Sequence, residues 1–280
     1  MGIQLIAMDL DGTLLDSTSK LPAENAAAIA EASARGIEIM IVTGRRFHSA
    51  RLIAEELPCP VELIVSNGAL LKSKSGETHL RSLLPTDIAR RVLDATEEFR
   101  SLCGVIFDRP DTNQVIFERI DWDGPYVGPY LRRHRSQVGE AMPLVGCLDG
   151  EDPVEVMFIG ECGAIRAALD TLERLAFRSD YTLALTEYEQ RGLSMLDVLQ
   201  RGVTKGAALA EWARRRGIPR ENVMAIGDNW NDREMLEYAG LPVVMGNSIS
   251  ELKSLGWAET FSNDQGGVAE AIRRYALGNG

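Results

Sequence analysis

Residues 3–15 read Ile3-Gln4-Leu5-Ile6-Ala7-Met8-Asp9-Leu10-Asp11-Gly12-Thr13-Leu14-Leu15, and the rest of the chain is organised around this stretch. Its apolar start is typical of a strand buried on both faces, as in a parallel sheet. Residues two apart on a strand point the same way, so Asp9 and Asp11 would face one cavity. Gly12 allows the tight turn that follows.

Two carboxylates this close together repel each other unless a cation or a shared proton lies between them. The pair Asp9 and Asp11 therefore indicates either a divalent metal site or a nucleophile with an acid/base partner. The alternative is a capping aspartate followed by a turn aspartate after an edge strand.

Composition argues against several classes of protein. The 280 residues are 45% hydrophobic and 25% charged, which are ordinary values for a globular chain, and the net charge is −11. Because no basic run with interleaved aromatic residues occurs, we expect no nucleic-acid partner, and the acidic balance argues against an anionic membrane surface. The sequence start lacks the features of a signal peptide, and no apolar run reaches the roughly 18 residues needed to span a bilayer. We therefore expect a soluble, cytoplasmic protein.

The cysteines are far apart in the sequence and form no Cys-x-x-Cys pair: Cys59, Cys103, Cys147 and Cys162. With three scattered histidines they make no recognisable zinc motif. We expect reduced thiols, as in a cytosolic protein.

Strands and helices alternate in both terminal parts of the sequence, which predicts βαβ units and a parallel sheet. The expected strands are 37–42, 61–65, 223–226, 242–245 and 259–261, and the expected helices are 23–35, 47–57, 205–216, 232–239, 249–255 and 268–277. In open sheets of this kind, ligands bind beyond the carboxyl ends of the strands. Asp9, Asp11, Thr43 and the pair Ser66-Asn67 all fall at such ends.

From about residue 71 to residue 197 the pattern changes to short β-like segments with fewer helices. The segments are 78–83, 105–108, 115–120, 154–159, 182–185 and 194–198, the helices are 85–102 and 163–177, and 121–143 is expected to be loops with one short helix. This pattern predicts an α+β insert with an antiparallel sheet. We assign residues 1–82 and 199–280 to a Rossmann-like parallel-sheet α/β core, and residues 83–198 to an inserted α+β domain.

The polar residues at the expected strand ends form an oxygen-rich set: Asp9, Asp11, Thr43, Asp228 and Asp232. Carboxylates with water suit Mg²⁺. Asp228 and Asp232 could instead cap the following helix, but two acids within five residues after a buried strand favour metal binding. Lys205 begins a helix, where the macrodipole disfavours a cation, so it is either paired with an anion or solvated. Thr43 could cap a helix or bind a phosphoryl oxygen.

Four motifs follow one another along the chain: Asp-x-Asp-Gly-Thr at 9–13, Thr-Gly-Arg at 43–45, Lys-Gly at 205–206 and Gly-Asp-Asn-x-Asn-Asp at 227–232. In this order they resemble the haloacid dehalogenase superfamily, and specifically the Cof-type phosphatases, which carry a type IIB cap domain between the second and third motifs. The resemblance covers both core segments and the position and size of the insert.

The resemblance implies a role for each matching catalytic residue. Asp9 would be the nucleophile that becomes an aspartyl-phosphate, and Asp11 would be the general acid and then the general base. Thr43 and Lys205 would hold the phosphoryl oxygens, and Gly44 would supply a backbone amide.

The resemblance also implies a Mg²⁺ cofactor. Its ligands would be Asp9, the carbonyl of Asp11, and Asp228, while Asp232 would orient the waters of the metal or Lys205. Substrate contacts would come from the core residues Arg45, Ser66, Asn67 and Asn231. In the insert, the loop residues Glu187, Tyr188, Arg191 and Gly192 either face the pocket or are solvated.

We therefore expect a Mg²⁺-dependent hydrolase of a small phosphomonoester, such as a sugar phosphate. A phosphomutase or phosphotransferase on the same scaffold is an alternative, in which an acceptor sugar replaces water. A signalling module that stores phosphate on Asp9, and a non-catalytic regulator that binds a phosphorylated metabolite, are further alternatives. The expected partner is a small phosphorylated metabolite, and the expected assembly is a monomer or a weak homodimer.

Overall fold

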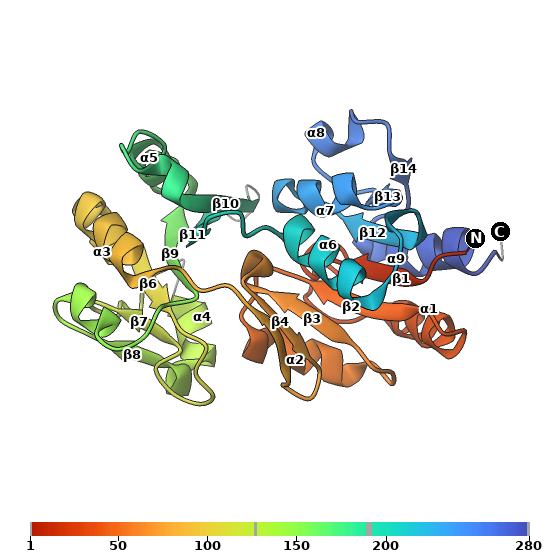
Figure 1. Ribbon diagram of the computed structural model, residues 1–280, viewed down its shortest axis with the longest axis horizontal. Coiled ribbons are helices and arrows are strands. Elements are labelled where there is room, and N and C mark those ends of the chain that lie inside the picture. Colours follow the sequence, from red (N-terminus) through yellow and green to blue (C-terminus); the bar gives the residue numbers. More distant parts are fainter. Residues whose placement is uncertain (1, 126–127, 189–191, 279–280) are drawn as a thin grey trace. The chain divides into compact units, whose positions relative to one another are not determined.

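The computed structural model describes residues 2–125, 128–188 and 192–278, and it divides into two compact units (Figure 1). The first unit, here called the core, comprises residues 1–81 and 203–280; the second, here called the insert, comprises residues 82–202. The boundaries predicted from the sequence lie after residues 82 and 198. The second junction lies later in the structure because the last strand of the insert, β11 (Leu193–Gln200), continues beyond residue 198.

The core contains an eight-stranded sheet. In spatial order its strands are β14 (Ala258–Glu259), β13 (Leu241–Val244), β12 (Val223–Gly227), β1 (Leu5–Met8), β2 (Glu38–Val42), β3 (Glu62–Val65), β4 (Leu70–Ser73) and β5 (Thr78–Arg81). The run from β14 to β3 is parallel, and β4 and β5 are added as an antiparallel hairpin at one edge. The predicted parallel-sheet α/β core is therefore confirmed.

The register of the central strands brings their carboxyl ends together. Met8, the last residue of β1, pairs with Ile226 of β12 on one side and with Ile41 of β2 on the other. The backbone amide of Asp9 then donates to the carbonyl of Ile226 at 3.0 Å. Because the strands are parallel and in register, the residues that follow β1, β2 and β12 emerge at the same edge of the sheet.

Helices cover the core sheet. They are α1 (Ala23–Ala34), α2 (Phe47–Glu56), α6 (Lys205–Arg216), α7 (Arg233–Tyr238), α8 (Ser250–Lys253) and α9 (Gly267–Ala271). Helices α6, α7 and α8 share one hydrophobic cluster with the sheet, to which they contribute Leu209, Met235 and Leu252. Helix α1 contacts α9, which lies next to it (Figure 1).

The bounds of α6 follow from its two ends. The hydroxyl of Thr204 accepts a hydrogen bond from the amide of Ala207 at 3.0 Å, so Thr204 is the N-cap. Gly217 has a φ of 67° and ends the helix in the left-handed conformation that glycine adopts without strain. The predicted helix 205–216 coincides with the observed one.

The insert contains a six-stranded sheet with helices. In spatial order the strands are β10 (Tyr181–Tyr188), β11, β9 (Glu155–Glu161), β6 (Cys103–Ile106), β7 (Val115–Phe117) and β8 (Val138–Glu140), and the helices are α3 (Thr86–Ala95), α4 (Gly128–Arg133) and α5 (Cys162–Glu173). Helices α3 and α5 pack on one face of this sheet (Figure 1), where Val92, Ile165 and Leu172 share a cluster with Phe158.

Three predictions for this region are wrong in detail. The segment 78–83, which the changed pattern groups with the insert segments, forms β5, which ends at Arg81 and pairs with β4 at the edge of the core sheet. The predicted helix 85–102 ends at Ala95, and a 3₁₀ segment (Glu97–Leu102) follows. The stretch 121–143 holds α4 but also β8, which pairs parallel to β7, so the sheet is not antiparallel throughout.

Among the described residues, none of the helices has both the length and the apolar composition that a bilayer crossing requires.

The packing of α6 on the core sheet yields a stability prediction. Leu209 is fully buried in the cluster beneath α6. The substitution Leu209→Ala is expected to lower the free energy of unfolding by about 3 kcal/mol, because it removes buried apolar groups and leaves a cavity in their place. Urea denaturation measures the change. The matched control is Leu52→Ala on α2, whose side chain is half exposed and whose loss is expected to cost under about 0.5 kcal/mol. Equal losses in the two variants would contradict the assigned packing.

Candidate active site

A buried lysine joins two of the motifs at the carboxyl edge of the core sheet. Lys205 is 1% exposed, and its Nζ lies 2.6 Å from Asp9 Oδ1 and 2.6 Å from Asp232 Oδ1. These distances are those of charge-assisted hydrogen bonds. Lys205 is therefore paired rather than solvated, and it links the end of β1 to the segment after β12.

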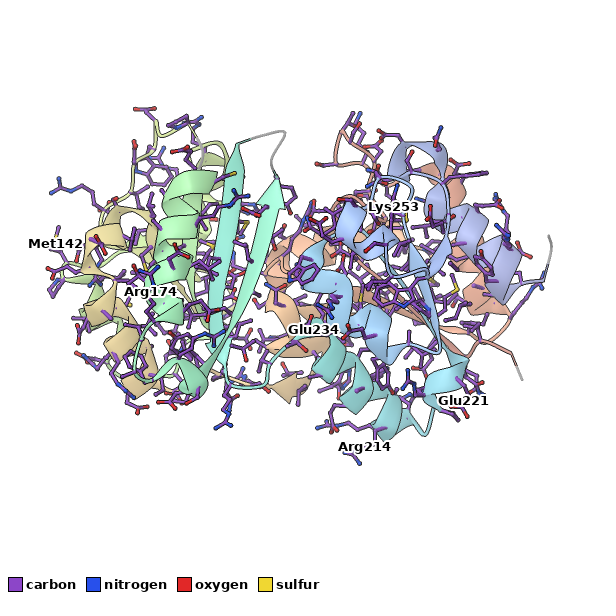
Figure 2. All side chains as sticks on the ribbon, turned by 90° about the horizontal axis from the view of Figure 1, so that it is seen from above. Met142, Arg174, Arg214, Glu221, Glu234 and Lys253 are labelled. Atoms are coloured by element: carbon purple, nitrogen blue, oxygen red, sulfur yellow. The ribbon has the colours of Figure 1, made fainter. Side chains whose placement is uncertain are left out.

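The position of Lys205 depends on close packing at the start of α6. Gly206 follows it, and a Cβ at Gly206 would lie 2.5 Å from the backbone carbonyl of Glu234 in α7. Figure 2 shows Glu234 on α7 beside α6. Only glycine lets the two helices approach this closely, and this approach brings Lys205 to the motif that precedes α7.

Asp232 uses both of its carboxylate oxygens within the protein. Its Oδ1 accepts from Lys205, and its Oδ2 accepts from the backbone amides of Asp228 and Asn229, both at 3.0 Å. Gly227 is required here, since a Cβ on it would lie 2.7 Å from the side chain of Asp232. Asp232 thus holds Lys205 and the backbone of Asp228 in place.

Asp228 is held from the other side by the loop that follows β1. The hydroxyl of Thr13 donates to Asp228 Oδ1 at 2.9 Å. Gly12, with a φ of 85°, passes so close that a Cβ on it would lie 2.4 Å from Asp228 Oδ2. The first and last motifs are therefore packed directly on one another.

Asp9, Asp228 and Asp232 form the acidic cluster of the site. One carboxylate oxygen from each lies within 4.8 Å of the others. Three carboxylates and the ammonium group of Lys205 carry a formal charge of −2 when all are ionised. Hard oxygen donors with this charge fit a divalent cation such as Mg²⁺.

The pKa values of these groups follow from burial and mutual charge. Burial raises the pKa of Asp9 to about 7; Lys205 opposes this rise, and Asp232 adds to it. Burial also raises the pKa of Asp228 well above its usual value, and the charges of Asp232 and Asp9 raise it further. Burial disfavours the charged form of Lys205, but the two carboxylates outweigh burial and hold the pKa of Lys205 above its usual value.

Asp11 has a different partner. Arg45, in the second motif, donates to it through Nε at 2.7 Å and through Nη2 at 2.6 Å, which is a bidentate ion pair. Thr43 is buried, and its hydroxyl accepts from the amide of Arg45 at 3.1 Å. The predicted residues Asp11, Thr43 and Arg45 are thus connected by direct contacts.

The end of β3 adds the predicted pair Ser66 and Asn67. Both are buried and have positive φ values of 48° and 50°, a conformation that costs non-glycine residues about 1–3 kcal/mol each. Their amides donate to the carbonyls of Arg45 and Thr43, and Asn67 Oδ1 accepts from Asn231 Nδ2 at 3.2 Å. The predicted Gly44 packs against the Asn67 amide, since a Cβ on Gly44 would lie 3.1 Å from it.

The residues predicted in the insert lie on and after β10. Glu187 forms an ion pair with Arg166 at 2.9 Å within the insert. Tyr188 is the last residue of β10, and Gly192 has a φ of 61°. Arg191 lies outside the described residues. No role for these residues follows from these observations.

Sequence reasoning missed Thr13 as a functional residue. The threonine stands in the first motif, but the pattern alone does not reveal that it contacts Asp228, 215 residues away. The sequence pattern indicates a turn or motif role for the glycines at 12, 206 and 227, whereas the structure shows that each one permits a close approach.

Comparison with known proteins agrees with the motifs. A family model described as haloacid dehalogenase-like hydrolase matches residues 6–272. A 5-amino-6-(5-phospho-D-ribitylamino)uracil phosphatase of Bacillus subtilis is 32% identical over 275 residues, covering 98% of this chain and 96% of the relative. A putative phosphatase of Streptococcus pyogenes is 29% identical over 285 residues, covering 99% and 100%.

Solved structures show the same fold. A haloacid dehalogenase-like hydrolase from Bacteroides thetaiotaomicron superimposes with a TM-score of 0.81 at 23% identity, covering 97% of this chain and 99% of its own. One from B. subtilis gives a TM-score of 0.79 at 25% identity, covering 97% and 99%.

The chain therefore belongs to the haloacid dehalogenase-like hydrolases. Within that family it is a phosphatase of the Cof type.

The charge of the acidic cluster predicts how stability responds to pH without divalent cations. Asp9 and Asp228 have raised pKa values in the folded state, so the folded protein binds more protons than the unfolded chain between about pH 4 and about pH 7. The free energy of unfolding should therefore fall as pH rises through that range in EDTA.

Asp228→Asn removes one of these buried charges and keeps an oxygen for Thr13. It is expected to be more stable than the parent at pH 7 by about 1–2 kcal/mol, with a smaller decline between pH 4 and pH 7. Thermal and urea unfolding in EDTA measure both effects. The control Asp170→Asn, an exposed aspartate of α5, should follow the parent profile. A less stable Asp228→Asn at pH 7 would contradict the assigned electrostatics.

Proposed function

We propose that this phosphatase depends on Mg²⁺ and hydrolyses small phosphomonoesters through an aspartyl-phosphate on Asp9. The observation that carries the proposal is the buried ion pair of Lys205 with Asp9 and Asp232 beside Asp228. A lysine held charged next to a carboxylate, at the carboxyl edge of a parallel sheet, is suited to receive a phosphoryl group.

In this proposal Mg²⁺ would be held by Asp9, by Asp228 and by the carbonyl of Asp11. Asp232 would not be a direct ligand of the ion, because both of its carboxylate oxygens already accept hydrogen bonds from Lys205 and from backbone amides. It would instead hold Lys205 in place. When bound, the ion supplies positive charge that offsets the two negative charges of the cluster and those of the phosphoryl oxygens.

The proposed chemical step uses Asp9 as the nucleophile and Asp11 as the acid and base. A carboxylate oxygen of Asp9 attacks phosphorus, the bond from phosphorus to the ester oxygen breaks, and Asp11 donates a proton to the leaving oxygen. Water then attacks the phosphorus of the aspartyl-phosphate, Asp11 takes its proton, and inorganic phosphate leaves with Asp9 restored. Lys205, Thr43 and the amide of Gly44 hold the phosphoryl oxygens throughout.

Arg45 has a specific part in this scheme. It aligns the carboxyl group of Asp11 through two hydrogen bonds. To pass a proton to the leaving oxygen, Asp11 has to exchange at least one of these contacts for the substrate. Ser66, Asn67 and Asn231 lie along the same edge, so they are proposed to contact the leaving group.

The proposed substrate is a small phosphorylated metabolite, such as a sugar phosphate. One relative is named for its action on 5-amino-6-(5-phospho-D-ribitylamino)uracil, a phosphomonoester of a sugar-alcohol chain. A screen of phosphorylated metabolites for Mg²⁺-dependent phosphate release would identify the preferred class.

Replacing the nucleophile tests the mechanism. Asp9→Asn is expected to reduce the release of inorganic phosphate about 10³-fold or more, because the amide cannot form the aspartyl-phosphate. A phosphate-release assay with Mg²⁺ measures it, and Asp170→Asn, with its exposed side chain, is the matched control. Phosphate release by Asp9→Asn at the parent rate would exclude the mechanism.

The same assay separates the hydrolase from its alternatives. Steady phosphate release without any acceptor supports hydrolysis. Turnover only when an acceptor sugar is added would indicate a phosphotransferase or mutase, and a stable phosphorylated Asp9 with little turnover would indicate a phosphate-storing module.

A further inference from the structure

Three asparagines converge on the backbone of the nucleophile loop, defined here as residues 9–15. Asn247 Nδ2 donates to the carbonyl of Gly12 at 2.8 Å, Asn25 Nδ2 to that of Leu14 at 3.0 Å, and Asn263 Nδ2 to that of Leu15 at 2.9 Å. None of the three asparagines lies in the four motifs. Three of the seven backbone carbonyls of this loop thus each accept a hydrogen bond from a side-chain amide.

The asparagines are themselves held by the last part of the chain. Asn25 Oδ1 accepts from the amide of Ala269 at 3.0 Å, and Asn247 Oδ1 accepts from the amide of Asn263 at 2.9 Å. Asn25 and Asn263 are buried, whereas Asn247 is exposed. The loop is therefore tied to residues 247–269, which follow it by more than 230 positions in the sequence.

The loop has little tolerance for movement at the point where Asn247 holds it. Gly12 approaches Asp228 so closely that it has no room for a Cβ, and the next residue, Thr13, donates to Asp228. The residue before it, Asp11, is held by Arg45. A shift of the Gly12 carbonyl would therefore move Asp11 and Thr13 together.

The backbone carbonyl of Asp11 is not among those that accept a hydrogen bond from the asparagines. In the described part of the chain, no protein donor reaches the Asp11 carbonyl. Fixing the carbonyls at 12, 14 and 15 from outside leaves this oxygen available and limits how the loop can rotate. This matters because catalytic groups held about 1 Å out of place lose on the order of 100-fold in rate.

We propose that Asn25, Asn247 and Asn263 are positioning residues for the phosphoryl-transfer step. They act through the backbone of the nucleophile loop and set the orientation of Asp11 and of its carbonyl. This inference rests on the proposed function for its kinetic consequence, whereas the hold on the loop is a separate property of the fold.

Asn247 provides the decisive test because its exposed side chain can be removed without opening a cavity in the core. The parent enzyme, Asn247→Ala and a control are compared in Mg²⁺-dependent hydrolysis of p-nitrophenyl phosphate and in hydrogen exchange of the amides of residues 9–15. The control is Asn222→Ala: Asn222 donates to Gln4 Oε1 at 3.1 Å at the opposite end of the sheet.

For Asn247→Ala we expect kcat to fall about 10- to 100-fold with KM changed less than about threefold, and faster exchange in residues 9–15. Asn222→Ala should keep the parent kcat and the parent exchange rates in the loop, even where it lowers Tm as much as Asn247→Ala does. Equal kcat and equal loop exchange in the two variants would overturn the proposal.

A second variant isolates the donated hydrogen bond. Asn247→Asp has the same shape and can still accept from the amide of Asn263, but it cannot donate to the Gly12 carbonyl. It should lose kcat as Asn247→Ala does, and a parent-like kcat would overturn the proposal.

Failure of the proposed function gives a different result. If the parent and Asn222→Ala both release no phosphate in any screened reaction, the function fails and hydrogen exchange alone decides the inference. Faster loop exchange in Asn247→Ala than in Asn222→Ala then still supports the positioning role, and equal exchange rejects it.

Discussion

The ion pair of Lys205 with Asp9 and Asp232 is the interaction on which the rest of the site depends. An ammonium group is retained inside a protein only when charged or polar groups compensate for its lost hydration. Here the compensating carboxylates come from the end of β1 and from the turn before α7, 196 and 27 residues away. The charged lysine therefore requires that these distant segments meet. Removing either carboxylate would leave part of that charge uncompensated.

The same cluster also holds more negative than positive charge. Asp228 adds a third carboxylate. Among the described residues it forms no ion pair, and its only side-chain hydrogen bond there comes from the neutral hydroxyl of Thr13. Burial is the main cause of the raised pKa values of Asp9 and Asp228, and the repulsion from the other carboxylates of the cluster adds to it. The core sheet has to offset the cost of burying these charges through packing, and it does so with strands whose residues are almost fully buried. Such local destabilisation is typical of functional sites, because the same charges are what a cation and a phosphoryl group require.

Much of this arrangement could be predicted from the sequence because parallel topology converts strand ends into neighbours. Asp9, Thr43 and Asp228 each come after an apolar run, and these runs predict β1, β2 and β12. What could not be predicted has physical reasons. Strand β8 has three residues without an apolar pattern, so it looks like loop until it pairs with β7. The bidentate contact of Arg45 with Asp11 and the hold of Asn247 on Gly12 join residues that are 34 and 235 positions apart. No local pattern encodes such contacts.

The order of the site residues along the chain limits how the site can form. The nucleophile loop comes first, whereas Lys205, Asp228, Asn247 and Asn263 all come after the insert. The contacts that hold the loop therefore form only when residues after 202 pack against it. Loop-closure entropy grows only with the logarithm of length, so the 121 residues of the insert, 82–202, add little to the cost of this closure. Because all four motifs lie in the core, the insert can change its sequence without altering the ion pair of Lys205.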